Sequence, residues 1–478
     1  MSQKSAVDSD SASVSWSEFV GVVHLPSVAL VCLAVWLHAA DSLVVATMLP
    51  AIVSEVGGVT LVGWMVALYE IGSIVAGVVS ALSVMRFGFR IPMACSALIF
   101  AAGCLLSSLG PEMSVILAGR LLQGAGGGGL VAMGFVVISV VFERRYTARI
   151  LAVVSAFWGL SAFMGPLIGG IFVEFATWRL CFAFFFLQAF ALAIWILLRA
   201  PTHPRQQIIQ QTSVPVLRLL VLSTSVICIA YAGVEISEIK TPLFIGLGLI
   251  TFVVFLSIDG GKDDANRLLP LSPLNPLTPA GATLSMILAL AVATIPIAAF
   301  GPLFISAIHG ASALTVGYIV ACSSIGWTIT AIIVSAAPER LDPILICVGV
   351  LMVISSIPGF LYAVPNGPLW LIALVAAIEG GDFGVSWTFI LRRTTALAAP
   401  TDTQRIAAAL PTIQRFGYAI GAVYIGLVAN AVGFASISNS AEAQMVAKSV
   451  FIACIPPALL ALPGLWGLVR KQEYEPVV

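Results

Sequence analysis

Charged residues are scarce in this sequence. Lys and Arg number 22 and Asp and Glu also 22, so 9% of the 478 residues are charged, against about 25% in a soluble globular domain. This scarcity excludes a soluble fold, because so few charges cannot cover a surface that faces water. The zero net charge also offers no basic surface, so we expect no nucleic-acid partner.

Paired cysteines and clustered metal ligands are also absent from the sequence. The eight cysteines lie singly within apolar runs with no C-x-x-C, which argues against a disulfide frame or a metal site. We find no nucleophile beside a base and no nucleotide-binding loop, so we expect no enzyme activity, no cofactor and no metal. The N-terminal stretch MSQKSAVDSDSASVSWSEF is polar and acidic, so a cleavable signal peptide is not expected.

Long hydrophobic runs dominate the sequence instead. Hydrophobic residues make up 60% of the chain, and about 20 of them in a row are enough for a helix to cross a bilayer. The sequence therefore predicts an all-α, polytopic membrane protein. Reading the runs between charged or Pro/Gly breaks gives fourteen membrane helices, over 27–49, 58–84, 91–110, 114–142, 148–174, 178–199, 214–233, 242–258, 280–307, 313–336, 343–364, 368–391, 408–434 and 447–469.

The distribution of Lys and Arg predicts the orientation of these helices. Arg120 and Arg415 fall inside predicted spans, and with the N-terminus inside the cell only Arg179, Lys240 and Lys448 fall on outer segments; the other basic residues fall on inner ones. In membrane proteins the cytoplasmic loops carry more Lys and Arg than the outer loops do. We therefore expect both termini in the cytoplasm.

Two polar intervals divide the spans into groups of six, two and six, a pattern that suits transporters built from two facing halves. The expected segments are a cytoplasmic tail (1–26), an N-terminal six-helix half (27–200), a two-helix insert with its flanking loop (201–260), a cytoplasmic loop (261–279), a C-terminal six-helix half (280–470) and a cytoplasmic tail (471–478).

A glycine-rich stretch, GRLLQGAGGGGL at 119–130, contains the spacing G-x-G-x-x-G. In a soluble α/β protein this spacing indicates a phosphate-binding loop after a strand. Here apolar sequence flanks it on both sides, with no room for a β-α-β unit. We therefore favour helix packing, in which Gly124 and Gly128 form a G-x-x-x-G face that admits another backbone.

Charges within the predicted spans are functional candidates, because a charge in hydrocarbon needs a partner or a wet cavity. Asp41 and Arg120 fall at similar depths and can pair, and His38 lies one helical turn before Asp41. One interpretation is a permanent ion pair that locks two helices. We favour a second, in which proton occupancy switches the pairing, because desolvation favours a protonated carboxyl and a nearby cation an ionised one.

The remaining charges lie elsewhere in the spans. Glu70 and Glu379 fall near the midplane, Asp382 lies one turn from Glu379, and Arg415 falls near a predicted helix end. The three carboxyls are either neutral and hydrogen-bonded, or part of a site that carries protons or recognises cations.

Three stretches together resemble the major facilitator superfamily, specifically its fourteen-span drug:proton antiporter branch. They are ADSLVVATMLPAI in the first span, GRLLQGAGGGG in the fourth and GLSAFMGPLIGG in the fifth. The last fits the antiporter motif G-x5-G-P-x2-G-G through Gly159, Gly165, Pro166, Gly169 and Gly170.

The resemblance implies a transporter fold and gives roles to individual residues. Arg120 and Gln123 match a motif linked to proton coupling, and we expect Asp41 and Glu70 to act with them. We expect the substrate cavity to include His38, Tyr69, Glu379, Asp382 and Trp387.

The loop between the second and third spans departs from the family pattern. It keeps Arg86, Gly88 and Arg90 of the inner-gate motif, but Ala81 and Met85 replace the usual glycine and aspartate. Such changes indicate a different gate, altered coupling or different substrates.

The predicted function is proton-coupled export of small lipophilic compounds, with cationic and neutral substrates both open. The expected partners are a small-molecule substrate, protons and membrane lipids, for a monomer in the inner (plasma) membrane of a bacterium. The alternatives are a membrane scaffold or lipid-handling protein that keeps the fold without coupled transport, and an uptake carrier or intramembrane enzyme.

Overall fold

The computed structural model describes residues 25–142, 146–199, 215–261, 267–335, 337–398 and 403–470. Within these ranges the regular structure is helical throughout, as the sequence predicts. The predicted tails and the polar intervals around 201–214 and 262–266 fall wholly or largely outside the described residues. The helices are α2 (Leu25–Val56), α3 (Val62–Phe87), α4 (Arg90–Leu109), α5 (Met113–Val141), α6 (Thr147–Phe175), α7 (Trp178–Arg199), α8 (Val216–Ala232), α9 (Lys240–Asp259), α10 (Pro279–Ala299), α11 (Gly301–His309), α12 (Ala313–Val334), α13 (Asp342–Asn366), α14 (Leu369–Leu397), α15 (Thr403–Ala431), α16 (Ser440–Ala453) and α17 (Ile455–Val469).

Every predicted span coincides with one of these helices or with a consecutive pair. Twelve helical segments in the described part of the chain are long and apolar enough to cross a membrane, counting α10 with α11 and α16 with α17 as one segment each. The other two predicted spans correspond to α8, which has 17 residues, and to α15, which is not among the twelve. The chain is therefore a multi-pass membrane protein.

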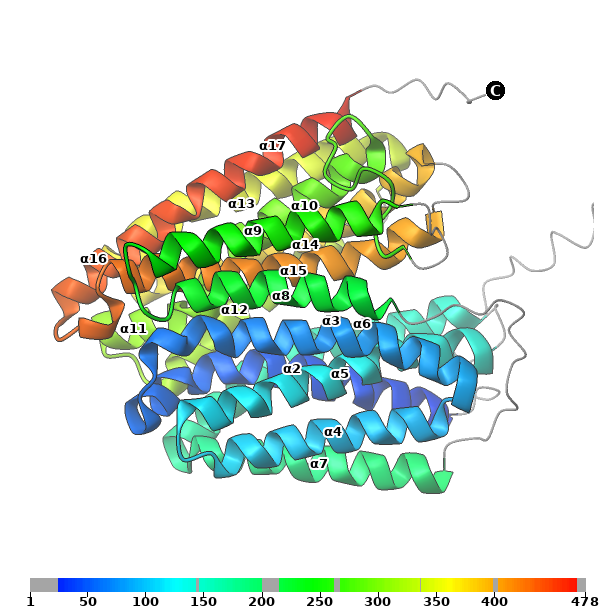
Figure 1. Cartoon of the computed structure of the whole chain (residues 1–478), viewed down its shortest axis with the longest axis horizontal. Coiled ribbons are helices and arrows are strands. Elements are labelled where there is room, and N and C mark those ends of the chain that lie inside the picture. Colours follow the sequence, from blue (N-terminus) through cyan, green and yellow to red (C-terminus); the bar gives the residue numbers. More distant parts are fainter. Residues whose placement is uncertain are drawn as a thin grey trace, which may run out of the picture.

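The helices form an elongated bundle in two groups (Figure 1). Helices α2 to α7 pack on one another, as do α10 to α17, while α6 packs on α12 and α3 on α15 across the junction of the groups. The start of α2 and the end of α17 lie at one end of the bundle, which we call the terminal end (Figure 1). The opposite, distal end holds the turn between α2 and α3, where Gly57 and Gly58 have φ of 70° and 75°, a region that favours glycine.

The glycines of α5 bring this helix against α3 and α4. A Cβ on Gly124 or Gly128 would meet the backbone of Tyr69 or Ser73 in α3, and one on Gly126 would meet Phe100 in α4. Small residues at these positions allow the backbones to approach closely. The interpretation of the glycine stretch as a packing face is confirmed, and this packing sets Tyr69 beside the turn of α5 that precedes the glycines.

The α8–α9 hairpin packs on α15 and also contacts α3. Arg218 pairs with Asp259 at 3.2 Å between Nε and Oδ1, and Asp259 accepts hydrogen bonds from the backbone N–H groups of Leu268 and Leu269. Near the distal end, Asn430 of α15 donates from Nδ2 to two carbonyl oxygens, those of Thr60 (3.0 Å) and Gly233 (2.6 Å). One side chain thus ties the hairpin to both groups of helices.

Candidate functional site

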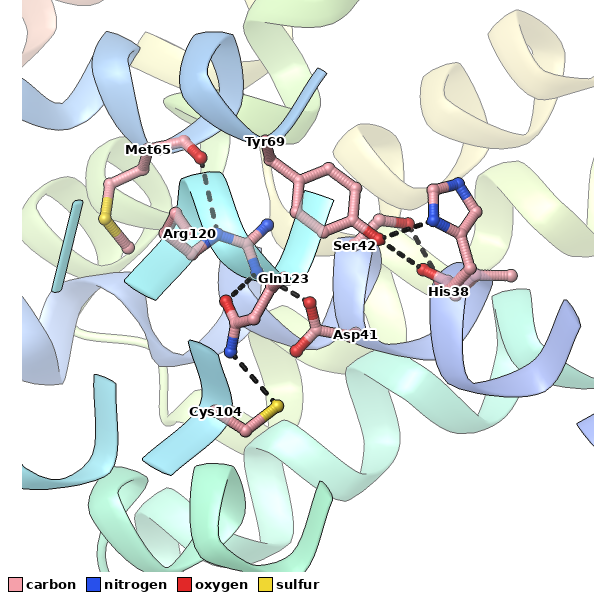
Figure 2. A network of polar contacts seen from close by, with 9 residues as sticks. His38, Asp41, Ser42, Met65, Tyr69, Cys104, Arg120 and Gln123 are labelled. Atoms are coloured by element: carbon pink, nitrogen blue, oxygen red, sulfur yellow. Dashed lines mark hydrogen bonds and ion pairs between the residues drawn. The ribbon is translucent and has the colours of Figure 1, made fainter. Parts of the chain in front are cut away.

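Asp41 and Arg120 form a fully buried ion pair between α2 and α5 (Figure 2). Arg120 Nη1 lies 2.7 Å from Asp41 Oδ2, and the two side chains are 3% and 0% exposed. Arg120 also donates to Gln123 Oε1 at 2.8 Å, and Gln123 Nε2 lies 3.3 Å from Cys104 Sγ. Each charge offsets part of the desolvation of the other, so removing either one strands its partner in an apolar interior.

Half of the Asp41 carboxylate is unsatisfied. Its Oδ1 is buried and has no hydrogen-bond partner among the residues that the structure describes. An unpaired carboxylate oxygen in such a place is costly, and a proton on it would relieve that cost while weakening the pair with Arg120. The geometry therefore suits a carboxyl that alternates between charged and neutral forms.

Tyr69 of α3 lies between this ion pair and His38 (Figure 2). Its ring covers the guanidinium of Arg120, with 4.2 Å from Cζ to the ring centroid. Its hydroxyl donates to the His38 carbonyl oxygen at 2.8 Å and lies 2.9 Å from His38 Nδ1. Tyr69 thus contacts the cation with its ring and the imidazole with its hydroxyl.

Arg415 of α15 reaches the other side of the same imidazole. Its Nη2 lies 2.8 Å from His38 Nε2, while its Nη1 donates to Glu70 Oε2 at 3.2 Å and to Ser73 Oγ at 2.9 Å. Glu70, predicted to act with Asp41 and Arg120, has Arg415 as its ionic partner instead.

Arg415 lies well inside its helix, and the prediction that it falls near a helix end was wrong. Helix α15 begins at Thr403, more than one turn before the predicted start of the span at 408. The polar residues TDTQR at 401–405 made the start of the span look later than it is. One signal in the sequence could have corrected this prediction, because Arg415 is a charged residue inside an apolar run.

Within the described residues, the acids of α14 share no hydrogen bond or ion pair with this network. Glu379 and Asp382 are 7% and 3% exposed, and Asp382 accepts a hydrogen bond from Ser386 Oγ at 3.1 Å. Within the described ranges neither has a basic partner. Trp387 lies beside Phe383, with 5.9 Å between ring centroids. The hydrogen bonds of His38 and Tyr69 run to α15 and α2 rather than to α14, and the shared cavity stays a prediction.

The antiporter motif places α6 between the two groups of helices. Gly165 and Gly169 face the backbone of α2, and Gly170 faces Leu314 of α12. Pro166 contributes the carbonyl that Gly317 of α12 approaches, and a Cβ on Gly159 would lie 3.8 Å from Thr328 Oγ1 of the same helix. These residues contact helices on both sides of the junction.

The predicted inner-gate residues lie where α3 ends and α4 begins. Gly88 follows α3 with φ of 73°, and Arg90 is the first residue of α4, partly exposed. The side chain of Arg86 is outside the described part of the structure, so its predicted role stays a prediction.

The chain is similar in sequence to known transport proteins. A family model described as Major Facilitator Superfamily matches residues 31–274. The chain is 26% identical over 429 residues to "Probable multidrug-efflux transporter Rv1634" of Mycobacterium tuberculosis, covering 87% of this chain and 90% of that protein. It is 29% identical over 178 residues to azole resistance protein 1 of Saccharomyces cerevisiae, covering 37% of this chain and 29% of that protein.

Solved structures share the fold at low identity. An inward-facing bacterial homologue of the human lysosomal transporter Spinster has a TM-score of 0.65 at 14% identity, covering 93% of this chain and 95% of its own. A D-xylose–proton symporter has a TM-score of 0.63 at 15% identity, covering 93% of this chain and 98% of its own.

Proposed function

Since the chain belongs to the major facilitator superfamily and is thus a membrane transporter of a small molecule, we propose that it is a proton-coupled antiporter that exports lipophilic compounds. The observation that carries this proposal is the buried Asp41–Arg120 pair with its unpartnered Oδ1. A proton on Asp41 would release Arg120 from its ionic partner, and its departure would restore the pair. The similarity to a multidrug-efflux transporter supports export as the direction.

The topology in this proposal has fourteen spans, with α8 and α15 added to the twelve segments counted above. The terminal end faces the cytoplasm and the distal end faces outward, in agreement with the Lys and Arg distribution. The six-helix halves 27–200 and 280–470 move against each other, and the insert 201–260 follows them. The mycobacterial relative supports the bacterial inner membrane as the location, and we propose a monomer in contact with lipid.

Alternating access would use the two cross-junction helix pairs. Helices α6 and α12 approach closely at Gly170 and Gly317, and α3 approaches α15 at Gly63, which faces Ala422. Small residues at these contacts let the halves rock without large side chains to displace. These close approaches support a state with its distal side closed.

The substrates that suit the α14 site are lipophilic cations. Glu379 and Asp382 are buried acids with no basic partner in the described ranges, and Phe383 and Trp387 offer aromatic faces on the same helix. Carboxylates and aromatic faces both attract cations in a desolvated place. A neutral substrate would instead hydrogen-bond to the protonated acids, so both classes belong in the test.

The test uses purified protein in proteoliposomes with an imposed pH gradient and ethidium as the transported probe. We expect gradient-driven export by the parent protein and its loss in Asp41→Asn, with Glu55→Gln as the matched control in the same helix. Unchanged gradient-driven export by Asp41→Asn would overturn the assigned role of Asp41. Absence of export by the parent protein, for cationic and neutral probes alike, would favour the scaffold interpretation.

A further inference from the structure

Arg415 joins the proton site of one half to the opposite half. We propose that Arg415 is a positioning residue through which the Asp41–Arg120 and Glu70–Arg415 ion pairs change protonation as one unit, with Tyr69 and His38 as the connection. This inference rests on the proposed proton coupling. It adds the chain of contacts through which protonation of Asp41 affects the contact between α3 and α15.

The first link is the contact between Arg120 and Tyr69. The guanidinium lies over the ring at 4.2 Å, and the same guanidinium holds Asp41 at 2.7 Å. When Asp41 takes a proton, Arg120 loses its ionic partner and keeps the neutral oxygens of Gln123 and Met65 and the electron-rich face of the Tyr69 ring. The position of Tyr69 therefore depends on the charge of Asp41.

The second link is His38, whose protonation state follows from its neighbours. Arg415 has only donors, so His38 Nε2 must accept from it and carry no proton. The neutral ring then holds its proton on Nδ1 and donates it to the Tyr69 hydroxyl, which in turn donates to the His38 carbonyl. Each of these groups is satisfied in one arrangement of protons.

The third link is the pair of bonds that Arg415 makes across the junction. A proton on His38 Nε2 would remove the acceptor and place a second cation beside Arg415, and a proton on Glu70 would remove its counter-charge. The charged and titratable groups that face His38 are Asp41 on its own helix, Tyr69 and Glu70 of α3, Arg120 of α5 and Arg415 of α15, and α6 adds the uncharged Trp158. The α3–α15 contact at this level is thus complete in one charge state only.

The distal contact of α15, with the turn that precedes α3, lacks this dependence. Asn430 ties α15 to Thr60 through an amide donor, which does not titrate. The two contacts together give α15 a fixed attachment near its distal end and a proton-dependent one near its middle. A change of protonation would therefore tilt α15 about its distal end.

Groups that interact only through their charges release protons over a wider pH range than independent ones. If one rearrangement breaks both ion pairs, release is instead positively cooperative and falls in a narrower range, and this provides the test. Purified protein in weakly buffered detergent solution is mixed with ethidium over a series of pH values, and the released protons are measured. For the parent protein we expect proton release to change steeply with pH, with a steepness close to that of roughly two protons released together. Tyr69→Phe keeps the ring over Arg120 but lacks the hydroxyl, so its curve should flatten towards roughly one-proton steepness with the total release unchanged.

Arg415→Lys should flatten the curve in the same way, because a single ammonium cannot reproduce the fork that holds His38 and Glu70. The double variant Tyr69→Phe/Arg415→Lys should flatten the curve no further, because both substitutions break the same connection between the two ion pairs. Tyr424→Phe and Arg393→Lys are the matched controls, because they alter a tyrosine and an arginine bonded to Ala453 and Leu468 away from the network. Thermal unfolding identifies any variant that fails to fold.

The possible outcomes distinguish failure of the coupled protonation from failure of the proposed proton-coupled transport. A steep parent curve that Tyr69→Phe and Arg415→Lys leave unchanged would overturn the inference and leave proton coupling standing. A shallow parent curve would overturn the inference as well. No proton release by the parent protein would contradict the proposed coupling itself.

Discussion

Arg415 of α15 and His38 of α2 are hydrogen-bonded across the junction of the two helix groups, 2.8 Å apart from Nη2 to Nε2 and 377 residues apart in the sequence. The same arginine holds Glu70 of α3, so one C-terminal side chain contacts two helices of the N-terminal group. The polar interior of this transporter is therefore shared between its halves.

Loss of Arg120 should destabilise the protein more than loss of the whole ion pair. Arg120→Gln leaves Asp41 buried with no cation, which costs about 3–5 kcal/mol unless the carboxyl takes a proton. We expect a lower thermal unfolding temperature and no substrate-dependent proton release near neutral pH. The double variant Asp41→Asn/Arg120→Gln should recover most of the stability without the proton release. Equal stability of the single variant and the parent would count against the pair as described.

The packing of α5 should tolerate no added methyl group at Gly128. Gly128→Ala places a Cβ against the backbone of Ser73, and such overpacking costs about 1–3 kcal/mol. Gly246 of α9 is the control, because a Cβ there meets nothing within 4 Å. Thermal unfolding should show a loss for Gly128→Ala and no loss for Gly246→Ala. A similar loss in both would contradict the close packing of α5 on α3.

Neutral versions of the α14 acids should weaken cation binding selectively. Glu379→Gln and Asp382→Asn remove charge from side chains that hold no basic partner in the described ranges, so stability should change little. We expect Kd for a cationic probe to rise by roughly tenfold or more, equivalent to about 1.4 kcal/mol, and Kd for a neutral probe to stay the same. Binding measured by isothermal titration calorimetry checks this. A similar rise in Kd for both probes would indicate that these acids have a structural role instead.

The amide of Asn430 should hold the distal side closed. Asn430→Asp removes the donors to Thr60 and Gly233 and leaves acceptors facing acceptors, at a cost of about 1–3 kcal/mol. A cysteine introduced at Val59 should then react faster with a membrane-impermeant maleimide than in the parent background. Asn439→Asp, at the N-cap of α16, is the control expected to leave the rate unchanged. An unchanged rate in Asn430→Asp would show that this amide does not hold the distal side closed.

Sequence reasoning reached the parts of this structure that depend on local pattern. Hydrophobic length located the helices, depth along two spans brought Asp41 to the level of Arg120, and the spacing of Gly124 and Gly128 predicted a packing face. Each of these follows from the 1.5 Å rise or the periodicity of a helix.

The partner of Glu70 could not be predicted in this way. Arg415 lies 345 residues away, and periodicity within one helix does not say which helix of the other group it will face. The polar run at 401–405 also hid the start of α15.

Export and proton entry should be one process, and measuring both fluxes in the same proteoliposomes tests this most directly. Ethidium leaves or enters down an imposed concentration gradient with no initial pH difference, while pyranine trapped inside the vesicles follows the internal pH. We predict that outward probe flux acidifies the side it leaves, and that Asp41→Asn abolishes this acidification. Probe flux with no opposite movement of protons would contradict proton-coupled export.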